Sequence, residues 1–119
     1  MRGSRHILVA IVEDDASLCR SLRAAGIQSA EYPSAEAFLA DGMKHRFDCL
    51  IVDIQLGGMS GIELSQHLAA SGSAPPVIFI TAHDEPAMRD QALRCGCAAY
   101  LKKTDSGQTV LSAIRRAIQ

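Results

Sequence analysis

The chain has 119 residues, with 12 Lys or Arg against 13 Asp or Glu and a formal net charge of −1 at pH 7. This length predicts one domain over residues 1–119 with a buried core of its own. The charge argues against direct nucleic-acid contact, which needs a basic face, and no apolar run approaches the roughly 20 residues of a membrane helix. The start leads straight into an apolar strand without a signal-peptide pattern, so we expect a cytoplasmic location.

Short apolar runs alternate with amphipathic segments along the whole chain. The runs are rich in β-branched residues, as in a sheet that is buried on both faces. We predict strands near residues 7–12, 28–32, 49–53, 77–81 and 98–102, and helices over about 16–25, 35–44, 60–70, from 84–86 onward, and 106–118. Strict alternation predicts a single doubly wound α/β domain, with a five-stranded parallel sheet, helices on both faces and right-handed crossovers.

Several residues mark where the predicted helices begin and end. Gly26 is a good left-handed terminator for the first helix, and Ser34 is a suitable N-cap for the second. Ser60 and Glu63 have the spacing of a capping box at the start of the third. Pro86 fits the first turn of the fourth, where its missing N–H does no harm.

Acidic residues follow two of the predicted strands. Glu13 and Asp14 come directly after the first strand, and Asp53 ends the third. The carboxyl ends of parallel strands share one edge of the sheet, where open α/β folds keep their sites. Three carboxylates meeting there repel one another unless a hard cation such as Mg²⁺ binds them. Because an Asp carboxylate can attack phosphorus, this pattern indicates phosphoryl chemistry at one reactive Asp.

Two other strands end in polar side chains that complete the predicted site. Thr81 places a hydroxyl at the same edge, and Lys103 places an ammonium group that could pair with a phosphoryl oxygen. Each feature alone has an ordinary explanation, since acidic residues often cap helices and a lone Thr or Lys is usually solvated. Asp53, followed by two glycines, could also form a turn. Their joint occurrence at successive strand ends favours a site.

With these motifs in view, the chain resembles the receiver domain of bacterial two-component response regulators over nearly its whole length. The matching stretches are residues 12–15, 52–64, 80–82 and 100–103. Residues 34–39 resemble the subgroup that precedes helix-turn-helix output domains in transcription factors. The resemblance implies a flavodoxin-like (βα)5 fold with strand order 2-1-3-4-5.

The resemblance also implies a role for each site residue. Asp53 would accept a phosphoryl group from the phosphohistidine of a sensor kinase or phosphotransfer protein, and Lys103 would contact that group. Thr81 and Tyr100 would form a coupled switch pair. Mg²⁺ or Mn²⁺ would be held by carboxylates and by one backbone carbonyl, the ligands being Glu13, Asp14, Asp53 and Gln55.

The implied function is a phosphoacceptor switch and not a turnover enzyme. Phosphorylation would change the surface formed by the fourth helix, fifth strand and fifth helix, which would control an output such as transcription and could support a homodimer. Neither nucleic acid nor a membrane is an expected partner of this domain.

Three departures from the family pattern affect these expectations. Glu13 stands where Asp is commoner, and Gly57 stands where Pro is frequent, so the loop after Asp53 should be more mobile. Thr104 replaces a proline that usually follows a cis bond; because a non-proline cis bond costs about 2.5–4 kcal/mol, a trans bond is expected. This change leaves Lys102 as an alternative to Lys103, which the Tyr-x-x-Lys spacing favours.

Three rival functions remain open at this point. A flavodoxin-like flavin binder shares the fold, but residues 12–16 would repel a phosphate and the chain has no Trp and two Tyr. A phosphatase could use Asp14 or Asp15 as its nucleophile, but a chain of this length leaves little room for a cap domain. A degenerate receiver that only mediates contacts is the third, and the intact set of site residues argues against it.

The remaining Cys and His residues suggest no second site. The four cysteines, Cys19, Cys49, Cys95 and Cys97, lack the paired spacing of a zinc site, and we interpret them as free thiols. His83 follows Thr81 by two residues and is expected to be an exposed loop residue.

Overall fold

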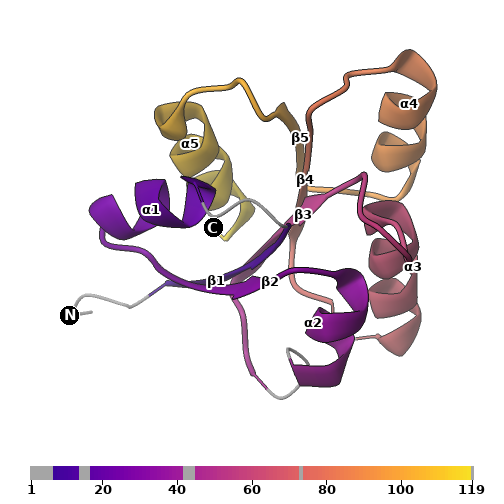
Figure 1. The fold of residues 1–119 in the computed structure, drawn as a ribbon, viewed down its shortest axis with the longest axis horizontal. Coiled ribbons are helices and arrows are strands. Elements are labelled where there is room, and N and C mark those ends of the chain that lie inside the picture. Colours follow the sequence, from indigo (N-terminus) through magenta and orange to yellow (C-terminus); the bar gives the residue numbers. More distant parts are fainter. Residues whose placement is uncertain (1–6, 14–16, 42–44, 73, 119) are drawn as a thin grey trace.

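The computed structural model describes residues 7–13, 17–41, 45–72 and 74–118. Within them, strands and helices alternate as the sequence predicts (Figure 1). The strands are β1 (Leu8–Val12), β2 (Gln28–Tyr32), β3 (Cys49–Asp53), β4 (Val77–Thr81) and β5 (Ala99–Lys102). The helices are α1 (Ser17–Ala24), α2 (Ala35–Asp41), α3 (Gly61–Ser71), α4 (Pro86–Arg94) and α5 (Gly107–Ala117).

All pairings in the five-stranded sheet are parallel, and the strand order is β2-β1-β3-β4-β5. The predicted fold is therefore confirmed, including the strand order. The strand boundaries agree with the prediction to within one residue. The predicted second helix extends to residue 44, but residues 42–44, like residue 16 of the first, lie outside the described part of the chain.

The sheet separates two apolar layers. Figure 1 shows α1 and α5 on one face and α2, α3 and α4 on the other. Phe38, Leu64 and Phe79 belong to the cluster under α2, α3 and α4, whereas Leu22 and Ile114 belong to the cluster under α1 and α5. The interior strands β3 and β4 are buried along their entire length, because helices cover both faces.

Residues that the sequence analysis expects to begin or end helices do so in the structure. Ser60 and Glu63 form the capping box: the Glu63 N–H donates to Ser60 Oγ and the Ser60 N–H donates to Glu63 Oε1, both at 3.1 Å. The Ala37 N–H donates to Ser34 Oγ at 3.0 Å, which confirms Ser34 as an N-cap. Gly26 has the positive φ of +83° expected after α1. These caps fix the end of α1 and the starts of α2 and α3 relative to the sheet edge.

Short connections bring the strand ends β1, β3, β4 and β5 to one edge of the sheet. None of the described helices is long and apolar enough to cross a membrane.

Candidate functional site

Asp53 is a buried carboxylate at this edge, with 5 % of its surface exposed. Its two oxygens have different partners. Oδ1 accepts a hydrogen bond from the Gln55 N–H at 2.9 Å, and Oδ2 lies 2.8 Å from Lys103 Nζ. The Asp53 side chain is therefore held in one orientation by the loop that follows β3 and by the ammonium group of Lys103, which follows β5.

Lys103 reaches Asp53 because of its place just after β5. Its backbone N–H donates to the Thr81 carbonyl at 2.8 Å, which continues the β4–β5 pairing by one residue. Successive side chains along a strand point to opposite sides, and the Lys102 ammonium accordingly lies on the other side, 4.0 Å from Asp84 Oδ2. Of the two candidate lysines, Lys103 is the one that contacts Asp53.

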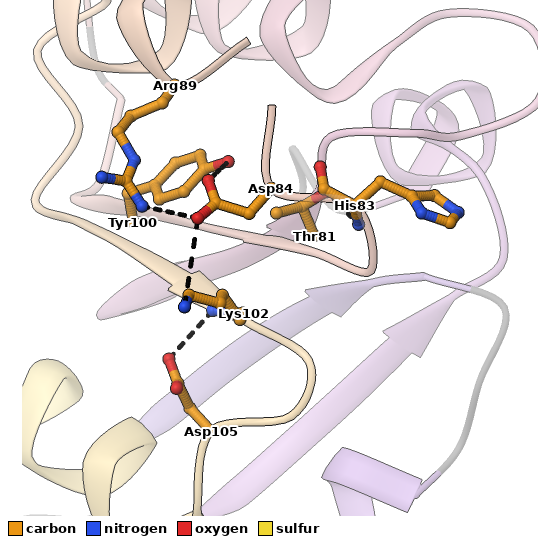
Figure 2. Close-up of polar contacts among 7 residues, drawn as sticks. All are labelled: Thr81, His83, Asp84, Arg89, Tyr100, Lys102 and Asp105. Atoms are coloured by element: carbon orange, nitrogen blue, oxygen red, sulfur yellow. Dashed lines mark hydrogen bonds and ion pairs between the residues drawn. The ribbon is translucent and has the colours of Figure 1, made fainter. Parts of the chain in front are cut away.

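The turn after Lys103 is closed without a cis peptide bond. No cis bond occurs in the described part of the chain, as the Thr104 substitution led us to expect. Lys102 and Asp105 close the turn instead: the Asp105 N–H donates to the Lys102 carbonyl at 3.0 Å, and the Lys102 N–H donates to Asp105 Oδ2 at 2.9 Å (Figure 2).

A second buried carboxylate lies beside this pair. Glu13 is 5 % exposed, and its Oε1 lies 3.9 Å from Lys103 Nζ, so one ammonium group faces two carboxylates. Glu13 and Lys103 also line a hollow of about 150 Å³ between α1 and α5, which Asp53 does not line. Carboxylate oxygens and an excess of negative charge suit a hard cation such as Mg²⁺.

The full predicted metal set cannot be assembled from the described residues. Asp14 lies outside them, and within them no three His, Cys, Asp or Glu side chains cluster as ligands. Glu13 and Asp53 do lie together, as predicted. The Gln55 carbonyl stays a prediction, since the contact seen for Gln55 is its N–H to Asp53.

Thr81 ends β4 and is fully buried. Its hydroxyl donates to the His83 carbonyl at 2.9 Å and accepts from the His83 N–H at 3.1 Å, so it closes a small turn at the start of the β4–α4 loop. His83 itself is exposed, in agreement with the sequence analysis. Thr81 Oγ1 is therefore occupied by its own loop in this structure.

Tyr100 lies in β5 opposite Phe79 of β4 and is partly buried. Its hydroxyl donates to Asp84 Oδ1 at 3.1 Å, and the Arg89 guanidinium lies over its ring, 5.3 Å from the centroid (Figure 2). Burial is the main reason that the pKa of Tyr100 is raised, and the hydrogen bond to Asp84 raises it further.

The backbone after Asp53 is packed tightly against the first turn of α3. The Gly61 N–H donates to the Ile54 carbonyl at 3.0 Å, and a Cβ at Gly61 would overlap the Asp53 carbonyl oxygen. The same loop is tied to α2, because the Met59 N–H donates to Glu36 Oε2 at 2.8 Å and holds the pKa of Glu36 below its usual value. This contact spans 23 residues, and no local signal in the sequence indicates it.

The cysteines are all free thiols, as expected. Cys19 and Cys49 are buried, and Cys95 and Cys97 are half-buried. Burial raises the pKa of the Cys49 thiol to about 12, which keeps it in its unreactive neutral form.

A parallel α/β sheet with a buried Asp, a second carboxylate and a Lys at its carboxyl edge defines a flavodoxin-like protein with a candidate phosphoacceptor site. The sequence profile of the response regulator receiver domain matches residues 9–115. The chain is 34% identical over 116 residues to nodulation protein W of Bradyrhizobium diazoefficiens, covering 94% of this chain and 51% of that protein. It is 32% identical over 111 residues to the transcriptional regulatory protein FixJ of Azorhizobium caulinodans, covering 91% of this chain and 53% of that protein.

The solved structures agree with this match. The crystal structure of FixJ-N superposes with a TM-score of 0.89 at 31% identity, covering 97% of this chain and 95% of that one. The chain therefore belongs to the response regulator receiver family, whose members are signalling switches and not turnover enzymes. It spans about half the length of the curated relatives. Family membership favours the receiver interpretation over a flavin binder or a phosphatase.

Proposed function

We propose that this domain is a phosphoacceptor switch in which Asp53 takes a phosphoryl group from a phosphohistidine on a sensor kinase or a phosphotransfer protein. The observation that carries this proposal is the 2.8 Å contact between Asp53 Oδ2 and Lys103 Nζ at the carboxyl edge of the sheet. A buried carboxylate with one oxygen facing an ammonium group suits attack on phosphorus, where positioning and charge neutralisation dominate.

The two oxygens of Asp53 have different roles in this proposal. Oδ1 is held by the Gln55 N–H, which leaves Oδ2 as the nucleophile. A bond forms between Oδ2 and phosphorus while the N–P bond of the donor breaks, and the leaving imidazole nitrogen keeps the electron pair. Lys103, already at Oδ2, then pairs with a phosphoryl oxygen.

The metal requirement follows from the charge at this edge. Glu13 and Asp53 are both buried, and the incoming phosphoryl group adds further negative charge. Glu13, Asp14, Asp53 and the Gln55 carbonyl would hold Mg²⁺ or Mn²⁺, which supplies charge neutralisation to the phosphoryl oxygens when bound. Lys103 supplies the protein's own share of that neutralisation.

Phosphorylation would be read out through Thr81 and Tyr100. The phosphoryl oxygens are stronger acceptors than the His83 carbonyl that Thr81 bonds here, so they would draw the Thr81 hydroxyl inward. Tyr100 would then turn into the space that Thr81 leaves, which would reshape the α4-β5-α5 surface and shift the population of states that can form a homodimer.

The output is proposed from the relatives. FixJ of A. caulinodans is named as a transcriptional regulatory protein, and we propose that this domain also controls transcription, through a separate output region. We also propose that this signalling takes place in the cytoplasm.

Intact-mass spectrometry after incubation with acetyl phosphate tests the proposal. The mass should rise by one phosphoryl group, about 80 Da, when Mg²⁺ or Mn²⁺ is present and not when EDTA replaces it. Asp53→Ala should abolish the rise, whereas Asp90→Ala, which removes an exposed carboxylate from α4, should retain it. Unchanged labelling of Asp53→Ala would refute the assignment.

A further inference from the structure

The Asp84 carboxylate gathers three partners just outside the site. Oδ1 accepts the Tyr100 hydroxyl at 3.1 Å, and Oδ2 lies 2.6 Å from Arg89 Nη2 and 4.0 Å from Lys102 Nζ. Figure 2 shows the carboxylate joined to Arg89 and Lys102, with the Arg89 guanidinium beside the Tyr100 ring. Its side chain is 24 % exposed, against 47 % for Arg89 and 52 % for Lys102, so the acceptor is more enclosed than either cation.

Asp84 is joined to the site through the backbone. It directly follows His83, whose N–H and carbonyl both bond the Thr81 hydroxyl. Thr81 Oγ1 has one proton to donate, so donating to a phosphoryl oxygen requires it to release the His83 carbonyl. The turn that positions Asp84 is therefore intact only while Thr81 points toward its own loop.

We propose that Asp84 is a positioning residue that latches the Tyr100 hydroxyl at the surface in the unphosphorylated domain and releases it when Thr81 leaves the His83 turn. This inference rests on the proposed function of Asp53 and adds a regulatory element to it. For Tyr100 to turn inward, its hydrogen bond to Asp84 must break, and Thr81 must also vacate the space that the ring would enter.

The hydrogen bond between Tyr100 and Asp84 can break without leaving the Asp84 carboxylate unpaired. When the Tyr100 hydroxyl leaves, Asp84 keeps its ion pair with Arg89, so the carboxylate stays compensated. Arg89 also loses its position over the Tyr100 ring, which weakens α4's connection to β5. Opening therefore changes the contacts of α4, the helix that the proposed output surface includes.

A plain surface ion pair is the alternative explanation, because exposed pairs commonly contribute little. The two explanations differ at Tyr100. An ion pair between Asp84 and Arg89 predicts no dependence of switching on the carboxylate once the domain is folded. A latch predicts that removing the carboxylate favours the phosphorylated-like state, and that the effect needs the Tyr100 hydroxyl.

The test measures beryllofluoride affinity and the state of Tyr100 together. Beryllofluoride with Mg²⁺ stands in for the phosphoryl group, and ¹³Cζ-labelled tyrosine gives one NMR signal each for Tyr32 and Tyr100, so Tyr32 serves as an internal control. Asp84→Ala should bind beryllofluoride about fivefold more tightly. The variant raises the population of the binding-competent state, and the apparent affinity rises in proportion to that population. Its Tyr100 signal in the free protein should move toward the beryllofluoride-bound position, and its phenol should titrate at a lower pH. Asp90→Ala, which removes an equal charge from the following helix α4, should match the wild type.

A double-mutant cycle completes the test. In a Tyr100→Phe background, Asp84→Ala should have no further effect on affinity, because the hydroxyl that the latch holds is already gone. Asp84→Leu keeps a side chain of similar size without a hydrogen-bond acceptor, and it serves in the cycle if the alanine variant does not fold. A wild-type protein that fails to bind beryllofluoride contradicts the proposed function. A wild type that binds, with both Asp84 variants matching it in affinity and in the Tyr100 signal, overturns the latch alone.

Discussion

Replacing Gly61 with alanine should destabilise the domain and displace the phosphoacceptor, although alanine is the better helix former. Gly61 is the first residue of α3. A Cβ there would overlap the Asp53 carbonyl oxygen and lie 2.9 Å from both Ile54 Cα and Val52 Cγ1. Two of these three atoms are backbone atoms of the site strand and its loop, so they cannot move aside as a flexible side chain would.

The magnitude follows from two opposing terms. Overpacking a tight contact costs about 1–3 kcal/mol, while replacing glycine in a helix gains at most about 1 kcal/mol. We expect a net loss of about 1–2 kcal/mol in the free energy of unfolding, which for a domain of this size lowers Tm by about 4 °C per kcal/mol. Because the overlap falls on the Asp53 carbonyl, the rate of phosphorylation should fall as well.

Gly57→Ala is the matched control for this prediction. Gly57 lies in the same loop, has nothing within 4 Å of its Cβ position and does not have a positive φ. Its alanine variant should be neutral or more stable by about 0.4–1 kcal/mol, through the lower entropy of the unfolded chain. Urea unfolding of both variants measures the difference. Equal stability of the two variants would refute the argument from close packing.

Three further predictions concern charge at the site and elsewhere. Asp14→Ala should abolish Mg²⁺ binding whereas Glu13→Asp should retain it, and Mg²⁺ titration of both variants will show whether these roles are correctly assigned. Lys103→Ala should slow phosphorylation by acetyl phosphate by about tenfold or more, since it removes a charge-assisted contact, while Lys102→Ala should leave the rate near that of the wild type; similar rates in the two variants would contradict the assignment. Burial and the bond to Asp41 raise the pKa of Tyr32 to about 12, so its contribution to stability is complete below pH 10 and is lost as the pH rises toward 12. Tyr32→Phe should remove that alkaline loss of stability, and unfolding curves from pH 9 to 12 check it.

The fold was predictable because its signals are local and repeated. The apolar runs that became β3 and β4 are buried along their length, and the capping box at Ser60 and Glu63 opens α3 where the sequence places it. Alternation of strands and helices then restricts the topology to a parallel sheet. The order of the strands came from the resemblance to receiver domains, since periodicity alone does not specify it.

The site was predictable where strand ends dictate position. Asp53, Lys103 and Glu13 meet because parallel strands deliver their carboxyl ends to one edge. The contacts of Glu36 and Asp84 were not predicted, because each depends on side chains from distant segments meeting across a loop. The Met59–Glu36 bond and the Tyr100–Asp84 bond join residues 23 and 16 positions apart, respectively.

The central claim is that Asp53 is the residue that carries the phosphoryl group, and chemical trapping tests it most directly. Borohydride reduces an aspartyl phosphate to homoserine, so peptide mass spectrometry after acetyl phosphate, Mg²⁺ and borohydride identifies the modified position. The account predicts homoserine at position 53, and no trapped product in Asp53→Asn. Homoserine at position 14 or 15 would contradict it and would favour a phosphatase-like nucleophile at the end of β1.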